Sequence, residues 1–95
     1  MTPLSQDSAE VIAIEALSWL AGTDDLFTIF MGSTGTSAVD VRTRAQDPEF
    51  LASVLDFLLM DDAWISAFCA AENYDPDFPM RARAALPGGA QVSWT

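Results

Sequence analysis

Apolar residues recur along the chain at intervals of three and four, the spacing that places side chains on one face of an α-helix. Six segments carry this spacing, and their boundaries follow from capping residues, prolines and glycines. We predict helices over residues 8–21, 24–31, 38–45, 48–60, 62–73 and 76–86. No segment alternates between apolar and polar residues as a half-buried strand would. The pattern therefore predicts an all-α protein.

The predicted helix starts share one chemistry. Asp7 and Ser37 each begin a four-residue segment with the spacing of a capping box. Asp47 and Asp75 each precede a proline, which suits the first helical position because no N–H is needed there. We expect both aspartates to cap their helices. Gly22 is expected to follow the first helix in the left-handed conformation.

The chain nearly repeats itself after a shift of 38 residues. The shift places residues 16–32 over 54–70, with identical residues at Leu17/Leu55, Leu20/Leu58, Asp24/Asp62 and Phe30/Phe68. Self-similarity at this period is typical of a supersecondary unit that is used twice.

This repeat predicts the domain organisation. We expect a compact six-helix domain over residues 1–89, built from two similar three-helix units at about 8–45 and 47–86. Residues 90–95 are expected to form a mobile tail.

Burial should differ sharply between the helices. The helix over residues 48–60 is apolar around most of its circumference, so we expect it to be central and the most buried. In the first helix, Val11 and Ile14 fall on the polar side, where a neighbouring segment covers them or they are exposed. Trp94 has no counterpart in the repeat. These three residues form a candidate interaction surface.

Composition and charge narrow the classes of partner. The 95 residues are 51% apolar and carry 14 acids, four arginines and neither lysine nor histidine, for a net charge of −10. Such a chain repels nucleic acid and anionic membranes, so we expect neither as a partner. The longest apolar run is too short to span a bilayer. No secretory signal is recognisable, and one cysteine cannot form an internal disulfide, so we expect a cytoplasmic protein.

The same composition is poor in catalytic groups. Without histidine and lysine, neither a Ser-His or Cys-His pair nor a Schiff base can form. The pairs Asp24-Asp25 and Asp61-Asp62 could act in acid–base chemistry or hold a cation, but their equivalent repeat positions favour capping. Cys69 lies on an apolar helix face and is expected to be a structural thiol. We predict no enzyme activity, no cofactor and no metal site.

All four cations belong to two Arg-x-Arg-Ala motifs. Arg42, Arg44, Arg81 and Arg83 could bind a carboxylate or phosphate, because guanidinium groups hold such anions bidentately. They could instead pair with local carboxylates such as Asp47 and with the ends of their own helices. The more than threefold excess of acids favours these structural pairings.

Three segments together carry a family resemblance. They are residues 9–13 (Ala-Glu-Val-Ile-Ala), 47–59 (Asp-Pro-Glu-Phe-Leu-Ala-Ser-Val-Leu-Asp-Phe-Leu-Leu) and 81–88 (Arg-Ala-Arg-Ala-Ala-Leu-Pro-Gly). The chain resembles a small uncharacterised alphaproteobacterial family, domain-of-unknown-function family 3572. The resemblance covers residues 7–89, and Gly-Ser-Thr-Gly at 32–35 stands where it implies a Leu-Thr-Gly-Leu-like turn. It implies a helical cytoplasmic domain and no particular activity.

Two functional hypotheses follow. The first is a small helical interaction module whose partner is another protein or, in a weak homodimer, a second copy of the chain. The second is a small-molecule-binding or minor enzymatic domain, with carboxylates or Arg42 and Arg81 converging on a cleft between the two units.

Overall fold

The computed structural model describes residues 4–23 and 25–87. These residues form helices and connecting segments with no strand, which confirms the all-α prediction. The helices are α1 (Gln6–Ala21), α2 (Leu26–Thr34), α3 (Ala38–Arg44), α4 (Pro48–Leu58), α5 (Asp62–Glu72) and α6 (Phe78–Ala84).

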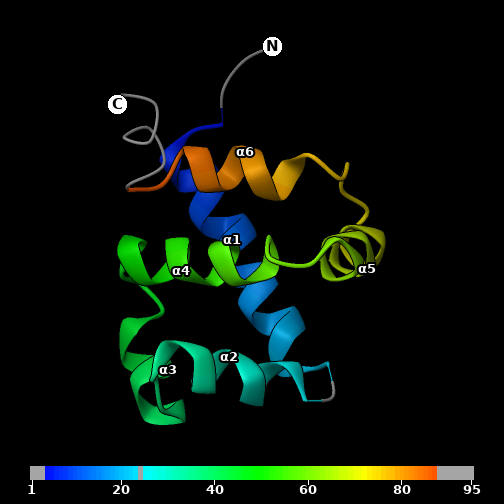
Figure 1. Cartoon of the computed structure of the whole chain (residues 1–95). Helices are drawn as coiled ribbons and strands as arrows, with labels where there is room; N and C mark the ends of the chain where they lie inside the picture. The colour runs from blue at the N-terminus through cyan, green and yellow to red at the C-terminus, as the bar shows by residue number, and fades with distance from the viewer. Residues whose placement is uncertain (1–3, 24, 88–95) are drawn as a thin grey trace, which may run out of the picture.

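The helices are arranged around α4. In Figure 1, α6 and α2 lie on opposite sides of α4, and α1 runs across α6 and α4 and ends beside α2. The tertiary contacts agree, since α1 packs against α2, α4 and α6, and α4 also packs against α2 and α6. This crossing brings the beginning of α1 next to α6, the last helix of the described residues.

The helix α4 is central, as its apolar circumference predicts. Seven of its eleven residues are buried: Phe50, Leu51, Ala52, Val54, Leu55, Phe57 and Leu58. Its start also follows the prediction, because the Asp47 side chain accepts a hydrogen bond from the Glu49 N–H at 3.0 Å. Pro48 occupies the first turn. The helix ends at Leu58, two residues earlier than predicted.

The first two helices differ from the predicted boundaries. The N-cap of α1 is Ser5 rather than Asp7, since the Ser5 Oγ accepts the Ser8 N–H at 3.1 Å. The helix therefore begins two residues earlier. Gly22 has a φ of −96°, so the left-handed conformation expected there is wrong. Gly35 instead adopts it, with a φ of 70°, and α2 continues past Gly32 to Thr34.

The later helix starts are a mixture of confirmed and wrong predictions. Ser37 caps α3 by accepting the Asp40 N–H at 3.2 Å, and Asp61 caps α5 by accepting the Ala63 N–H at 2.8 Å. Asp75 does not cap α6, which begins only at Phe78. The backbone carbonyl of Asp75 accepts the Phe78 N–H at 3.0 Å, so a turn replaces the first helical residues predicted there.

Aromatic side chains join segments from the two halves of the chain. Phe30 of α2 meets Phe57 of α4 edge to face at 5.4 Å between ring centroids. Trp19 of α1 meets Phe68 of α5 at 5.9 Å. The repeat pairs Leu17/Leu55, Leu20/Leu58 and Phe30/Phe68 are all buried. The structural similarity of the two units stays a prediction.

Candidate functional site

The helix α1 presents two apolar side chains to solvent. Val11 is 55% exposed and Ile14 is 45% exposed. They lie three residues apart, so they are neighbours on the same face of the helix. Other positions of α1, including Leu17 and Leu20, are buried in the core. Of the two possibilities that the sequence left open for Val11 and Ile14, exposure is the one that the structure shows.

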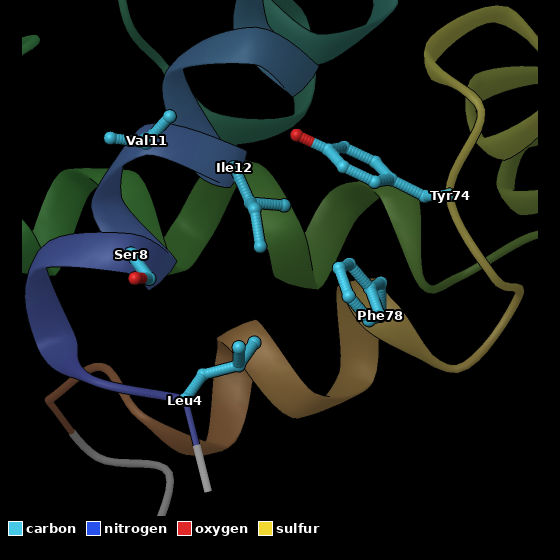
Figure 2. A pocket seen from close by; sticks show the side chains of 6 residues that line it. All are labelled: Leu4, Ser8, Val11, Ile12, Tyr74 and Phe78. Atoms are coloured by element: carbon cyan, nitrogen blue, oxygen red, sulfur yellow. The ribbon is translucent and has the colours of Figure 1, made fainter.

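A pocket of about 300 Å³ adjoins this face, between the beginning of α1 and the beginning of α6. Its lining residues are Leu4, Ser8, Val11, Ile12, Tyr74 and Phe78. Figure 2 shows Ser8 and Val11 on one side of the hollow and Tyr74 and Phe78 on the other. The Ser8 hydroxyl and the Tyr74 phenol are the polar groups of an otherwise apolar set of side chains. We call Val11, Ile14 and this pocket the α1 surface.

Tyr74 is fixed in this wall by a hydrogen bond across the fold. Its phenol O–H donates to Oε1 of Glu15 on α1. This bond to a carboxylate favours the protonated phenol and, together with partial burial and the charges of Glu15 and Glu72, raises the pKa of Tyr74 to about 12. The Tyr74 ring also stacks on Phe78 at 5.1 Å. The ring centroids of Tyr74 and Phe68 are 6.0 Å apart. The wall of the pocket is therefore held by one hydrogen bond and two aromatic contacts.

Four carboxylates are adjacent in the sequence to residues that line the pocket. Asp7 and Glu10 flank its lining residues on α1, and Asp75 and Asp77 flank Tyr74 and Phe78. Asp7, Asp75 and Asp77 are exposed, and Glu10 is partly exposed. A cation also lies nearby, because the Arg81 guanidinium carbon is 5.0 Å from the Phe78 ring centroid. The four acids next to the lining residues in the sequence thus outnumber this cation.

The four arginines of the candidate anion site do not come together. Arg42 and Arg44 are on α3, and Arg81 and Arg83 are on α6. These helices lie at opposite ends of the molecule in Figure 1. The second hypothesis offered a cleft on which Arg42 and Arg81 converge, and this arrangement of the two helices does not provide it.

Individual arginines make structural contacts instead. Arg83 Nε lies 2.6 Å from Oδ1 of Asp56 on α4, and its Nη1 donates to the Pro87 carbonyl at 3.0 Å. The Arg44 guanidinium carbon lies 5.3 Å from the Phe50 ring centroid, and Arg42 is exposed. The ion pair of Arg83 thus links α6 to α4 rather than to a local helix cap.

Cys69 is a buried free thiol. Burial raises the pKa of Cys69, and the negative charges of Asp77 and Asp75 raise it further. Its Sγ donates to the Asp75 carbonyl at 3.5 Å. A thiol kept protonated in this way is a poor nucleophile, which supports the structural role predicted for it.

Three features predicted from the sequence are not covered by the described residues. Asp24, Trp94 and the tail over residues 90–95 lie outside the residues that the structure describes.

Among residues 4–23 and 25–87, no three Cys, Asp or Glu side chains are grouped so that they could hold a metal ion. Within the same residues, no helix has the length and apolar character needed to cross a membrane.

Sequence reasoning singled out Val11 but missed the rest of the pocket. Leu4, Tyr74 and Phe78 reach it from segments far apart in the chain. Tyr74 is the single tyrosine of the sequence, yet nothing in its spacing indicates a contact with a residue 59 positions away.

The described residues thus form an all-helical domain with two exposed apolar side chains on α1 beside a pocket. The chain belongs to the family described as "Protein of unknown function (DUF3572)", whose model matches residues 6–89. Neither the curated proteins nor the solved structures include a match to the chain.

Proposed function

We propose that this protein is a small protein-interaction module without catalytic activity, and that it docks its partner on the α1 surface. The observation that carries the proposal is the pair of neighbouring exposed side chains, Val11 and Ile14, beside a pocket with mainly apolar lining residues. Apolar side chains scattered over a surface need no explanation, whereas adjacent ones next to a hollow are typical of a docking site.

The chemistry of the chain supports a binding role over catalysis. The sequence offers no histidine or lysine as a general base. Cys69 is buried and carries a raised pKa. The buried free thiol of Cys69 also favours a reducing compartment, which supports the proposal that the module is cytoplasmic.

Affinity capture from the native cell, with matched variants, tests this function. The test variant, Val11→Ser/Ile14→Ser, removes the apolar contacts without a change of charge. The control is Val39→Ser, since Val39 is 73% exposed on α3 at the other end of the molecule. We expect a protein that the wild type and the control capture and the double variant loses. Equal capture by all three would place the docking site elsewhere.

A small-molecule ligand is the second candidate, and the pocket itself favours it. A volume of about 300 Å³ is at the lower end of the range for small-molecule sites. A thermal-denaturation screen of small molecules tests this candidate, with Ser8→Leu as the variant that fills the pocket. A ligand that stabilises the wild type and not Ser8→Leu would support it.

A further inference from the structure

Resting on the interaction function proposed above, we infer that the partner of the α1 surface is a basic amphipathic helix of another protein. Shape, local charge and overall charge each support this occupant.

The shape of the α1 surface fits a helix that carries apolar residues on one side. Val11 and Ile14 are neighbours along the α1 axis, and the pocket continues the apolar surface toward Tyr74 and Phe78. An apolar cavity of about 150 Å³ holds one benzene ring, so a pocket of about 300 Å³ has room for one or two apolar side chains. An amphipathic helix supplies such side chains every three or four residues.

Local charge selects a basic helix over an acidic one. Asp7, Glu10, Asp75 and Asp77 each adjoin a residue that lines the pocket. Apolar side chains of a partner in the pocket would bring its flanking residues near these carboxylates. Lysine or arginine at the flanking positions would be attracted, and aspartate or glutamate would be repelled.

Overall charge argues against the other occupants. Two copies of this chain would each bring a net charge of −10 to a shared interface, and this repulsion opposes a dimer at low salt. Anionic membranes and nucleic acids are repelled for the same reason. A cationic amphipathic protein segment complements both the apolar side chains of the α1 surface and the negative charge of the chain.

Fluorescence anisotropy of two labelled helical peptides tests the inference on the full chain. One peptide has leucine on its apolar face and lysine on its polar face, and the other has glutamate in place of lysine. We expect the basic peptide to bind and the acidic one not to bind. Val11→Ser/Ile14→Ser should weaken binding about tenfold or more, and Val39→Ser should leave it unchanged. Binding should also weaken as salt increases.

A second pair of variants tests where the charge acts. Asp7→Lys and Asp40→Lys change the net charge equally, and each residue lies in the first turn of a helix. We expect Asp7→Lys to weaken binding about two- to fivefold, as for loss of an exposed ion pair, and Asp40→Lys to have a smaller effect. Circular dichroism confirms that each variant is folded.

The outcomes separate this inference from the proposed function. Absence of basic-peptide binding, or equal binding by the variants and their controls, overturns the basic-helix partner. A dimer that forms at low salt and that Val11→Ser/Ile14→Ser dissociates would make a second copy the occupant and would also overturn it. If a captured protein depends on Val11 and Ile14 but binds Asp7→Lys and Asp40→Lys alike, the interaction function stands and the basic partner fails. If no captured protein depends on Val11 and Ile14, both the interaction function of the α1 surface and the basic partner are overturned.

Discussion

The Tyr74 phenol O–H donates a hydrogen bond to the Glu15 carboxylate, and this bond ties the segment between α5 and α6 to α1. Tyr74 also lines the pocket of the α1 surface. The bond therefore positions one wall of the candidate docking site, and a perturbation of it should be measurable both as a pKa and as stability.

The pKa of Tyr74 is accessible to direct titration because the chain contains one tyrosine. In the native protein the phenolate should appear with a midpoint near pH 12, compared with the ordinary value of 10.0. Glu15→Gln keeps an acceptor but removes the charge, so the midpoint should fall toward 10.0. Ultraviolet absorbance of the phenolate measures both. An ordinary midpoint in the wild type would show that the Glu15 contact is absent in solution.

The same shift predicts a pH dependence of stability. Folding raises the pKa of Tyr74, so the native state retains this proton to higher pH than the unfolded chain does. The stabilisation is fully present below about pH 10 and is lost as the pH rises toward about 12. Tyr74→Phe cannot titrate there. The difference in unfolding free energy between wild type and Tyr74→Phe should therefore shrink across this window, as measured by chemical denaturation at several pH values.

Truncation of the core of α4 should be severely destabilising. Leu55 and Leu58 are fully buried, and a leucine-to-alanine change in such a core costs about 2–5 kcal/mol. Met60 is 73% exposed just beyond the helix, so Met60→Ala should change the unfolding free energy by no more than about 0.5 kcal/mol. Chemical denaturation compares the three variants. Losses under about 1 kcal/mol for both leucines would mean that α4 is not the centre of the core.

Replacement of the two aspartates that precede prolines should lower the unfolding free energy by different amounts. Asp47 caps α4 through its side chain, so Asp47→Ala should cost about 0.5–2 kcal/mol, and Asp47→Asn should retain most of the stability. Asp75 contributes its backbone carbonyl to the turn before α6, so Asp75→Ala should cost no more than about 0.5 kcal/mol. Thermal and chemical denaturation distinguish them. Equal losses at both positions would contradict this assignment.

Self-association should be weak and should strengthen with salt. A fully buried valine or isoleucine side chain contributes about 1.5–3 kcal/mol, and association costs at least about 4 kcal/mol. Val11 and Ile14 alone thus support at most a weak dimer. We expect a monomer at low salt and weak dimers at high salt, where screening reduces the repulsion between chains.

Sedimentation velocity at two salt concentrations measures this association. Val11→Glu/Ile14→Glu should remain monomeric, and Val39→Glu should behave as the wild type does. A monomer at both salt concentrations would exclude the homodimer, and dimers formed by Val11→Glu/Ile14→Glu would place the interface elsewhere.

The helices and the centre of the fold were predictable from the amino-acid sequence, because helix formation and burial follow from local chemistry. The apolar circumference of α4 required burial on all sides, and the Asp47-Pro48 pair marked where that helix begins. The polar neighbours of Val11 and Ile14 set them apart from the core face of their helix. The predicted cap at Asp7 was wrong, because the Ser5 side chain accepts the Ser8 N–H and α1 begins earlier, at Gln6.

The surroundings of Val11 depend instead on tertiary packing. The crossing of α1 over α6 brings Leu4, Tyr74 and Phe78 together around the pocket, and α3 and α6 at opposite ends keep Arg42 and Arg81 apart. Periodicity describes one helix at a time, whereas the angle and order in which helices pack depend on the shapes of many side chains at once. For that reason the position of Val11 on the polar side of α1 was predictable, whereas its exposure, the pocket, the Tyr74–Glu15 bond and the raised pKa of Tyr74 were not.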